Sequence, residues 1–334
     1  MLRAKNLFNQ MYMYHNLYTA FYKAAKGKRK KADVIDYKKD LDNNLNRLQN
    51  QIIELNPDVG HYRFFVIRDP KVRQICAASF PERVLHHAIM NICEPVLDNY
   101  AIHDSYACRK DKGTIKAIER CQAFVRQSEW FLKLDIKKYF DSIDHEIAIH
   151  LLSKKFKESA IITLFQKIFD TYHTTPYKGL PIGNLVSQHV ANFYLGPMDH
   201  WLYQHQQVKK YIRYMDDFII FSNNKRFLKE LLENINCFLN EQLALMLKHT
   251  IQLNRTRLGV PFLGFRIFPD RIQLLQGSKK RFKQKFQKYE HMYQTDQWSE
   301  QELARHMEPL FAFIKTGQTL AFRKNVIQRF GVSS

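Results

Sequence analysis

The sequence contains few cysteines, and none of them forms a recognisable pair. There are 5 in 334 residues, none at C-x-x-C spacing: Cys76, Cys93, Cys108, Cys121 and Cys237. An odd number of scattered cysteines argues against both a disulfide framework and a structural zinc site. This usage fits the reducing environment of a cytoplasm.

Long apolar runs are also missing. No stretch approaches the roughly 20 consecutive apolar residues that a membrane-spanning helix needs. Polar and basic residues interrupt the N-terminal segment MLRAKNLFNQMYMYH, which therefore lacks the apolar centre of a secretory signal. Internal repeats and low-complexity linkers are absent from the sequence as well. We therefore expect a folded protein with no membrane partner.

Acidic residues are scarce for a chain of this size. There are 32 Asp and Glu against 52 Lys and Arg, a formal net charge of +20, and a hydrophobic fraction of 45% that is normal for a folded protein. Tyrosines and phenylalanines are interleaved with the basic runs, and aromatic faces stack on bases while Lys and Arg contact phosphates. This pattern favours a nucleic-acid partner over the alternative, a basic enzyme whose charge only aids solubility.

Hydrophobic periodicity predicts a mixed α+β fold. Residues 1–56 have helical spacing, and a β-hairpin is expected across Asp69-Pro70. Further helices are predicted from Pro81 and from a cap near Thr114. The remaining expected helices are 154–171, 186–206 with a perturbation at Gly196-Pro197, 225–243, and the basic segment from 279 onwards. Strands are expected in WFLKLD, on both sides of YMDD, and in GVPFLGFRIFPDRIQLL.

The most informative stretch is YIRYMDDFIIF, which places Asp216 and Asp217 between two apolar strands. Adjacent carboxylates are unfavourable there unless they find partners, and the alternative is a solvated turn. In WFLKLDIKKYFDSID, Asp135 also ends an apolar strand. A strand-end carboxylate that faces carboxylates at a hairpin tip predicts a divalent-metal site. Asp141 and Asp144 follow the strand and are assigned to helix capping instead.

Oxygen ligands of this kind suit Mg²⁺, which takes few protein ligands and completes its octahedron with water and substrate phosphate. Two such ions about 4 Å apart support in-line attack at phosphorus. The proposed ligands are the carboxylates of Asp135, Asp216 and, less directly, Asp217, together with the backbone carbonyl of Ile136.

Three motifs occur in a fixed order: LDIKKYFDSID at 134–144, YMDD at 214–217 and PFLGF at 261–265. This ordered set resembles the palm of a reverse transcriptase, and the resemblance extends from about Arg68 to Gly264. It implies a right-hand polymerase fold with fingers, an antiparallel palm sheet that carries YMDD, and a short helical thumb. The implied parts are an N-terminal helical extension (1–60), fingers (61–130), first part of the palm (131–145), fingers/palm connection (146–180), palm with primer grip (181–269) and basic helical thumb (270–334).

The resemblance implies an RNA-directed DNA polymerase with catalytic Asp135, Asp216 and Asp217. Its cofactors would be two Mg²⁺ ions, with Mn²⁺ as a substitute, and its partners template RNA, cDNA and dNTPs. Phe140, five positions after the first aspartate, would pack under the sugar and exclude a ribose 2′-OH; the alternative is an ordinary core phenylalanine. Ile182 and Gly183 would complete that side of the dNTP site.

FFVIRDPKVRQICAASFPERV resembles the fingers. Arg68 and Arg73 would bind the incoming triphosphate, because a guanidinium forms paired, charge-assisted hydrogen bonds; the alternative is two exposed arginines on a hairpin. Arg83 would lie near the template strand. Arg109 would serve architecture or template contact.

PFLGF resembles the primer grip, a hairpin that positions the primer terminus: Phe262, Leu263 and Gly264. Lys248 lies near the position of a lysine that could protonate the leaving pyrophosphate, and His249 is the competing candidate. The basic segment SKKRFKQKFQKYEHMY resembles a thumb that tracks a hybrid duplex.

LPIGNLVSQ indicates a branch of the family. Most reverse transcriptases carry Gln where this chain has Ile182, and Ser-Pro where it has Ser187-Gln188. The combination seen here resembles enzymes of bacterial and phage diversity-generating retroelements, as does ACRKDKGT. The resemblance implies adenine-mutagenic cDNA synthesis from a template-repeat RNA for mutagenic retrohoming and protein diversification. It also implies a small, basic, pentameric accessory variability protein as a partner.

Ile182 and Gln188 are the residues to which we assign fidelity. A Gln amide could hydrogen-bond the nascent base pair, whereas Ile182 offers only van der Waals contact, a loss in selectivity of order 1–3 kcal/mol. Three alternatives stay open from the sequence. They are a defence-associated reverse transcriptase that copies its own non-coding RNA, an RNA-dependent RNA polymerase, which Phe140 disfavours, and a non-catalytic RNA-binding scaffold, which the three retained carboxylates disfavour.

Overall fold

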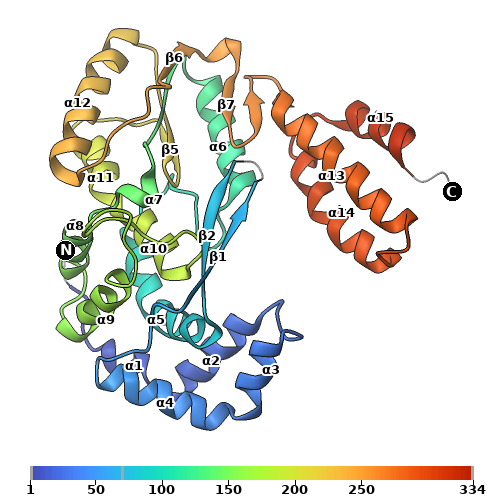
Figure 1. Cartoon of the computed structure of the whole chain (residues 1–334). Helices are drawn as coiled ribbons and strands as arrows, with labels where there is room; N and C mark the ends of the chain where they lie inside the picture. The colour runs from blue at the N-terminus through green and yellow to red at the C-terminus, as the bar shows by residue number, and fades with distance from the viewer. Residues whose placement is uncertain (1–2, 69–70, 332–334) are drawn as a thin grey trace.

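A computed structural model describes residues 3–68 and 71–331 of the chain. The predicted mixed α+β architecture is confirmed: helices surround sheets of two, four and three strands (Figure 1). The turn expected at Asp69-Pro70 lies outside the described residues. Within them, no helix combines the length and the apolar character that crossing a membrane requires.

Four short helices form the N-terminal region and pack under a long helix. They are α1 (Phe8–Met11), α2 (Tyr14–Ala25), α3 (Ala32–Lys39) and α4 (Leu41–Ile53), and the long helix is α5 (Phe80–Tyr100). The spacing of apolar residues explains α4, which buries Leu45, Leu48 and Ile52 on one side. Pro81 lies in the first turn of α5, where a missing backbone N–H does no harm.

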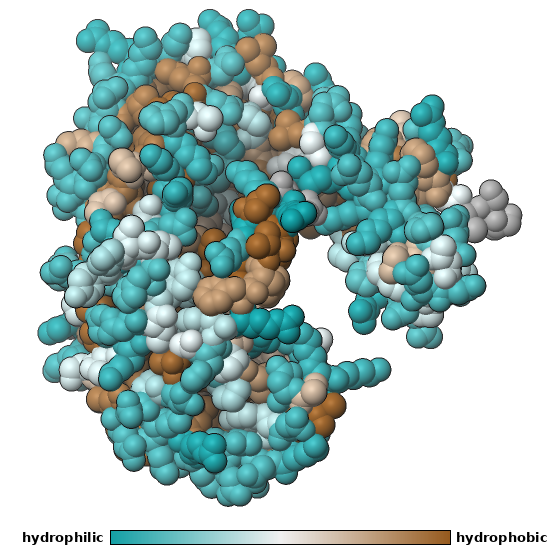
Figure 2. Space-filling model, in the orientation of Figure 1, coloured by the Kyte–Doolittle hydropathy of each residue, from teal (hydrophilic) through white to brown (hydrophobic). Residues whose placement is uncertain are grey.

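A two-stranded hairpin rises from this region. Strands β1 (Tyr62–Ile67) and β2 (Arg73–Ala78) pair antiparallel, from Tyr62 opposite Ala78 to Ile67 opposite Arg73. Most of β1 is exposed, and its apolar residues are Phe64, Phe65, Val66 and Ile67. Figure 2 shows apolar atoms gathered at the middle of the molecule, where this hairpin lies beside an open notch.

The central sheet has the strand order β4-β5-β3-β6. Its members are β3 (Trp130–Asp135), β4 (Tyr211–Tyr214), β5 (Asp217–Ser222) and β6 (Gln252–Arg255). Because side chains alternate along a strand, the sheet faces two cores. Leu132 and Ile220 belong to the core shared with α10 (Leu185–Tyr194), α11 (Gly196–Gln204) and α12 (Lys225–Leu243). Phe131 and Ile219 belong to a second core with α6 (Thr114–Arg126).

The start of one predicted helix was wrong. The helix expected over 154–171 begins only at Ser159, as α9 (Ser159–Phe169), and a separate helix, α8 (His145–Ser153), precedes it. Glu158, the residue before α9, accepts hydrogen bonds from Leu7 N and Phe8 N at the start of α1. The helix expected from a cap near Thr114 is α6, whose N-cap is Gly113 without a side-chain cap. The expected capping by Asp144 at α8 is confirmed, and Asp141 lies in the first turn of α7 (Tyr139–Ser142).

The C-terminal part is a small sheet followed by three helices. The sheet contains β7 (Val260–Phe262), β8 (Phe265–Ile267) and β9 (Ile272–Leu274), after the 3₁₀ turn η1 (Thr256–Leu258). The helices are α13 (Gln276–Gln294), α14 (Glu300–Lys315) and α15 (Leu320–Phe330), which stand to one side of the body in Figure 1. Their aromatic residues join the second core, so this part is anchored to the central sheet.

Candidate active site

The strand register brings two of the predicted carboxylates together. Strands β3 and β5 pair antiparallel with Asp135 directly opposite Asp217, and such cross-strand partners have Cβ atoms about 5 Å apart. Asp216 precedes Asp217 in the turn after β4, beside Met215, whose φ of +57° is left-handed. The end of β3 and the turn between β4 and β5 therefore place three acids at the same end of the central strands.

The environment of these acids is electrostatically unfavourable in the absence of a cation. Burial raises the pKa of Asp216 to about 6, and the neighbouring charge of Asp135 adds to the rise. Burial also raises the pKa of Asp217, while Lys133 opposes that rise. Two carboxyl groups with raised pKa values in one place are typical of a functional site.

Two lysines contact these carboxylates. Lys248 Nζ lies 2.5 Å from Asp135 Oδ1, and Lys133 Nζ lies 2.8 Å from Asp217 Oδ2. The structure thus places the candidate acid Lys248 in the site, whereas the competing His249 is exposed. Lys133 was missed by the sequence analysis, although a lysine inside the apolar strand WFLKLD is a signal. It also lies over the Phe262 ring, 5.5 Å from its centroid.

The donor set fits a hard divalent cation. Asp217 Oδ1 is buried and has no hydrogen-bond partner among the described residues, and the other donors are carboxylate oxygens, which Mg²⁺ prefers. No set of three or more His, Cys, Asp and Glu side chains within 3–68 and 71–331 is arranged as a ready-made metal cage. Asp135 and Asp217 each turn an oxygen to a lysine instead. Ile136 is fully buried and pairs with Leu247.

A buried ion pair supports the turn that carries Asp216. Arg213, the third residue of β4, is fully buried and donates to both oxygens of Asp199 at 2.5 to 3.1 Å. It also donates to Asn192 Oδ1 at 2.9 Å and to the Met215 carbonyl at 3.1 Å. The sequence analysis missed this group, although an arginine between apolar residues in YIRY was visible. Arg213 therefore holds the backbone next to Asp216.

The segment LPIGNLVSQ lies against the hairpin. Cys76 N donates to the Ile182 carbonyl at 2.8 Å, and Ala78 N donates to Asn184 Oδ1 at 3.3 Å. Gly183 has a φ of +116°, and a Cβ there would lie 2.8 Å from Ile75 Cγ2. Only glycine fits this left-handed position close to β2. The loop thus joins the predicted dNTP-binding and fidelity residues to the hairpin.

The other predicted residues lie on separate elements. Phe140 is half-buried at the start of α7, and its carbonyl accepts from Leu180 N. Arg68 and Arg73 are exposed at the end of the hairpin. Arg109 is tied to Asp98 and to the Ile102 and Ser105 carbonyls, which indicates an architectural role.

The predicted primer grip is a tight turn between β7 and β8. Leu263 and Gly264 have φ values of +47° and +90°, which is typical of a two-residue hairpin turn. Phe262 is buried, and the Gly264 carbonyl accepts from Ser278 Oγ at 2.8 Å. The turn is therefore fixed to the first turn of α13.

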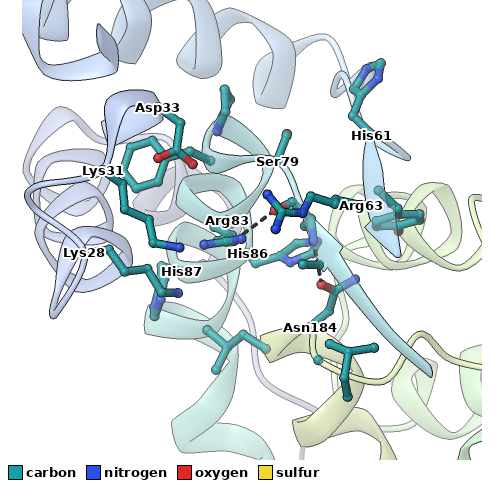
Figure 3. Close-up of a pocket in the computed structure, with 18 of the residues that line it drawn as sticks. Lys28, Lys31, Asp33, His61, Arg63, Ser79, Arg83, His86, His87 and Asn184 are labelled. Atoms are coloured by element: carbon teal, nitrogen blue, oxygen red, sulfur yellow. Dashed lines mark hydrogen bonds between the residues drawn. The ribbon is translucent and has the colours of Figure 1, made fainter. Parts of the chain in front are cut away.

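A basic cavity of about 1030 Å³ lies between the N-terminal helices, the hairpin and the segment LPIGNLVSQ (Figure 3). Its lining contains four cations, Lys28, Lys31, Arg63 and Arg83, and one acid, Asp33. The histidines His61, His86 and His87 also line it. Gly183, Asn184 and Gln188 also line it. Such a surface suits phosphate groups.

Known proteins are similar to part of the chain. It is 24% identical over 158 residues to the COX1/OXI3 intron 2 protein of Saccharomyces cerevisiae, covering 45% of this chain and 17% of that protein. It is 28% identical over 141 residues to the group II intron-encoded protein LtrA of Lactococcus lactis subsp. cremoris, covering 40% and 23%. The chain therefore spans less than a quarter of the length of these relatives.

A solved structure shares the fold. Apo telomerase from Candida tropicalis, truncated from its C-terminal domain, superposes with a TM-score of 0.51 at 12% identity, covering 64% of this chain and 55% of that one. The profile described as reverse transcriptase (RNA-dependent DNA polymerase) matches residues 67–267, a range that contains the three carboxylates and their lysines. Because the match extends over more than half of the sequence, the chain belongs to the reverse transcriptase family.

Proposed function

We propose that this protein is an RNA-directed DNA polymerase that extends a primer on an RNA template with dNTPs. The observation that carries the proposal is the pairing of Asp135 with Asp217 beside Asp216, in a chain of the reverse transcriptase family. Membership of that family implies the use of a divalent metal, template RNA and nucleotides. Asp135, Asp216, Asp217 and the Ile136 carbonyl would hold two Mg²⁺ ions, which when bound polarise the reacting phosphate and activate the primer hydroxyl.

The chain's own residues supply positioning and proton transfer. The β7–β8 turn would hold the primer terminus, while Arg68 and Arg73 contact the triphosphate and Phe140 packs under its sugar. The basic cavity would hold template phosphates. Lys248, whose Nζ contacts Asp135, would give its proton to the leaving pyrophosphate. Positioning of two substrates accounts for much of the rate enhancement in such transfers.

A single substitution tests the catalytic assignment. Asp216→Asn keeps the size of the side chain but removes its charge, so we expect cDNA synthesis on a primed RNA template to fall by at least about 10³-fold. Asp296→Asn is the matched control, because it makes the same chemical change at an exposed residue in the turn between α13 and α14. Synthesis by Asp216→Asn at the wild-type rate would overturn the metal assignment.

We further propose that the enzyme is the adenine-mutagenic polymerase of a diversity-generating retroelement, with a small basic accessory protein as a partner. This finer proposal is supported by the residues Ile182 and Gln188 and by their resemblance to that branch. Ile182 contributes its carbonyl to the hairpin and offers no side-chain hydrogen bond to a base pair.

The fidelity proposal has its own test. Ile182→Gln is expected to lower misincorporation at template adenines about tenfold, since one discriminating hydrogen bond corresponds to about 1–3 kcal/mol. The measurement is deep sequencing of cDNA made by both enzymes on one RNA template, with Ile182→Val as the control. Identical error spectra for the Gln variant and the wild type would rule out this role for Ile182.

A further inference from the structure

Helix α2 carries a stripe of exposed aromatic rings that the candidate active site does not use. Tyr14, Tyr18 and Tyr22 occur at four-residue spacing and are 45%, 39% and 37% exposed. Four residues of helix rise about 6 Å, so the rings lie one above another on one side. The other side of α2 buries Leu17 and Phe21 in the core. The stripe therefore lies on the side of the helix that faces away from the core.

The three rings are held in place rather than free. Tyr14 and Tyr18 stack with centroids 6.1 Å apart, and Tyr18 and Tyr22 lie 4.8 Å apart. Tyr14 Oη donates to Asp42 Oδ1 at 2.5 Å, and the hydroxyls of Tyr18 and Tyr22 lie 3.1 Å apart. A tyrosine that is already oriented loses little entropy when a ligand stacks on it. The stripe is a prepared binding surface.

A dense run of basic residues follows the stripe directly. The turn from α2 to α3 contains Lys26, Lys28, Arg29, Lys30 and Lys31, and no acidic residue. Lys28 and Lys31 line the basic cavity, where Figure 3 shows them on the side of His87 and Arg83. Burial lowers the pKa of Lys28, and the nearby charges of Arg83 and Lys31 add to the effect. The stripe and the basic turn are thus consecutive in the chain, and the turn contributes two lysines to the cavity.

We propose that the tyrosine stripe of α2 and the basic turn 26–31 bind a single-stranded segment of RNA adjoining the basic cavity. Rings for base stacking beside cations for phosphates are the two components of a single-strand site. The same charges disfavour a basic protein as the occupant of this surface. The proposal rests on the proposed function for its choice of RNA. It extends that function to a region that no catalytic residue occupies.

The experiment compares two primer–templates that differ only in their single-stranded template overhang, about 12 against about 2 nucleotides. Affinities are measured by fluorescence anisotropy, with Asp216→Asn as the parent so that no synthesis occurs. One variant replaces Tyr14, Tyr18 and Tyr22 with Ser, and the matched control replaces the same three with Phe, which keeps the rings. A third variant replaces Lys26, Arg29 and Lys30 with Gln.

We expect the parent and the Phe variant to bind the long overhang about tenfold more tightly than the short one, and the Ser variant to lose most of this gain. Its salt dependence should stay that of the parent, because stacking releases no counterions, whereas the Gln variant should show a shallower salt slope. A Ser variant that keeps the full gain, or a Phe variant that loses it equally, would overturn the proposal. Because binding is measured without catalysis, inactivity of the enzyme would not affect the outcome.

Discussion

Single charged residues inside apolar strands determine the geometry of the site. Lys133 lies two positions before Asp135 in β3, so strand alternation places both side chains on one face, where Lys133 contacts Asp217. Arg213 lies before the Tyr-Met-Asp-Asp turn and clamps the Met215 carbonyl. Each of these residues would be unfavourable without its partner. The sequence shows that Lys133 and Arg213 lie within apolar strands. It does not show which residues they contact, because some of their partners are distant in sequence.

The pair of Arg213 and Asp199 is fully buried, which makes its contribution measurable. Arg213→Met leaves a buried, unpaired carboxylate, so we expect the free energy of unfolding to fall by about 3–5 kcal/mol. The double variant Arg213→Met/Asp199→Asn removes that charge and should recover part of the loss. Guanidinium titrations of the wild type, both single variants and the double variant give the coupling energy. Strictly additive effects would contradict the pairing.

His86 makes stability depend on pH. It is buried in α5, and burial lowers its pKa to about 3, with the charges of His87 and Arg83 adding to the effect. The unfolded chain binds a proton near pH 6.5 and the folded chain does not, so stability is lost as the pH falls below that value. Between pH 7.5 and pH 5, this residue should remove about 2 kcal/mol of the free energy of unfolding.

The check for His86 is a comparison of slopes. His86→Leu keeps a similar volume but cannot titrate, so its free energy of unfolding should fall less over the same pH range. Glu82 Oε1 lies 3.6 Å from His86 Nε2, so both proteins are also compared in a Glu82→Gln background, which removes the titration of that carboxyl group. Equal falls in the wild type and the variant would show that His86 does not carry the effect.

Helices and strands that depend on local sequence could be predicted from the sequence. The strands around YMDD, the helix 225–243 and the break at Gly196-Pro197 follow from periodicity and from proline and glycine chemistry. Two features depended on distant partners and were not predictable. The interruption between α8 and α9 arises where Glu158 meets the start of α1. Strand β6 is short and mostly exposed, and it exists through its pairing with β3.

Gly183, which has a left-handed backbone conformation and packs against β2, provides a test of how the elements fit together. Gly183→Ala adds backbone strain and also a close contact with Ile75 of β2, so we expect a loss of stability of more than about 1 kcal/mol and weaker primer extension. Gly113→Ala is the control, because its φ of +97° is similar but a Cβ there meets no atom within 4 Å. Thermal unfolding of both variants separates the clash from the strain. Equal melting temperatures would show that the contact is unimportant.

The whole molecule has a formal net charge of +20, so its binding to nucleic acid should depend on salt. In α13, Lys280 and Lys288 are exposed. Binding to an RNA–DNA duplex is measured as a function of salt concentration. Replacing both lysines with Gln should make the plot of log affinity against log salt concentration shallower, by about 1 in slope for each lysine. The control pair Lys167→Gln/Lys229→Gln has the same charge change on α9 and α12. An equal effect of the control pair would indicate non-specific attraction only.

The whole molecule is proposed to be a DNA polymerase that copies RNA, with its chemistry at the carboxylates of Asp135, Asp216 and Asp217. The most direct measurement is primer extension by the full chain on an RNA template with Mg²⁺, with dNTPs or with ribonucleotides, followed by sequencing of the product. We expect complementary DNA from dNTPs, little product from ribonucleotides because of Phe140, and none from Asp216→Asn. Extension with ribonucleotides alone, or DNA synthesis that persists in Asp216→Asn, would contradict this proposal.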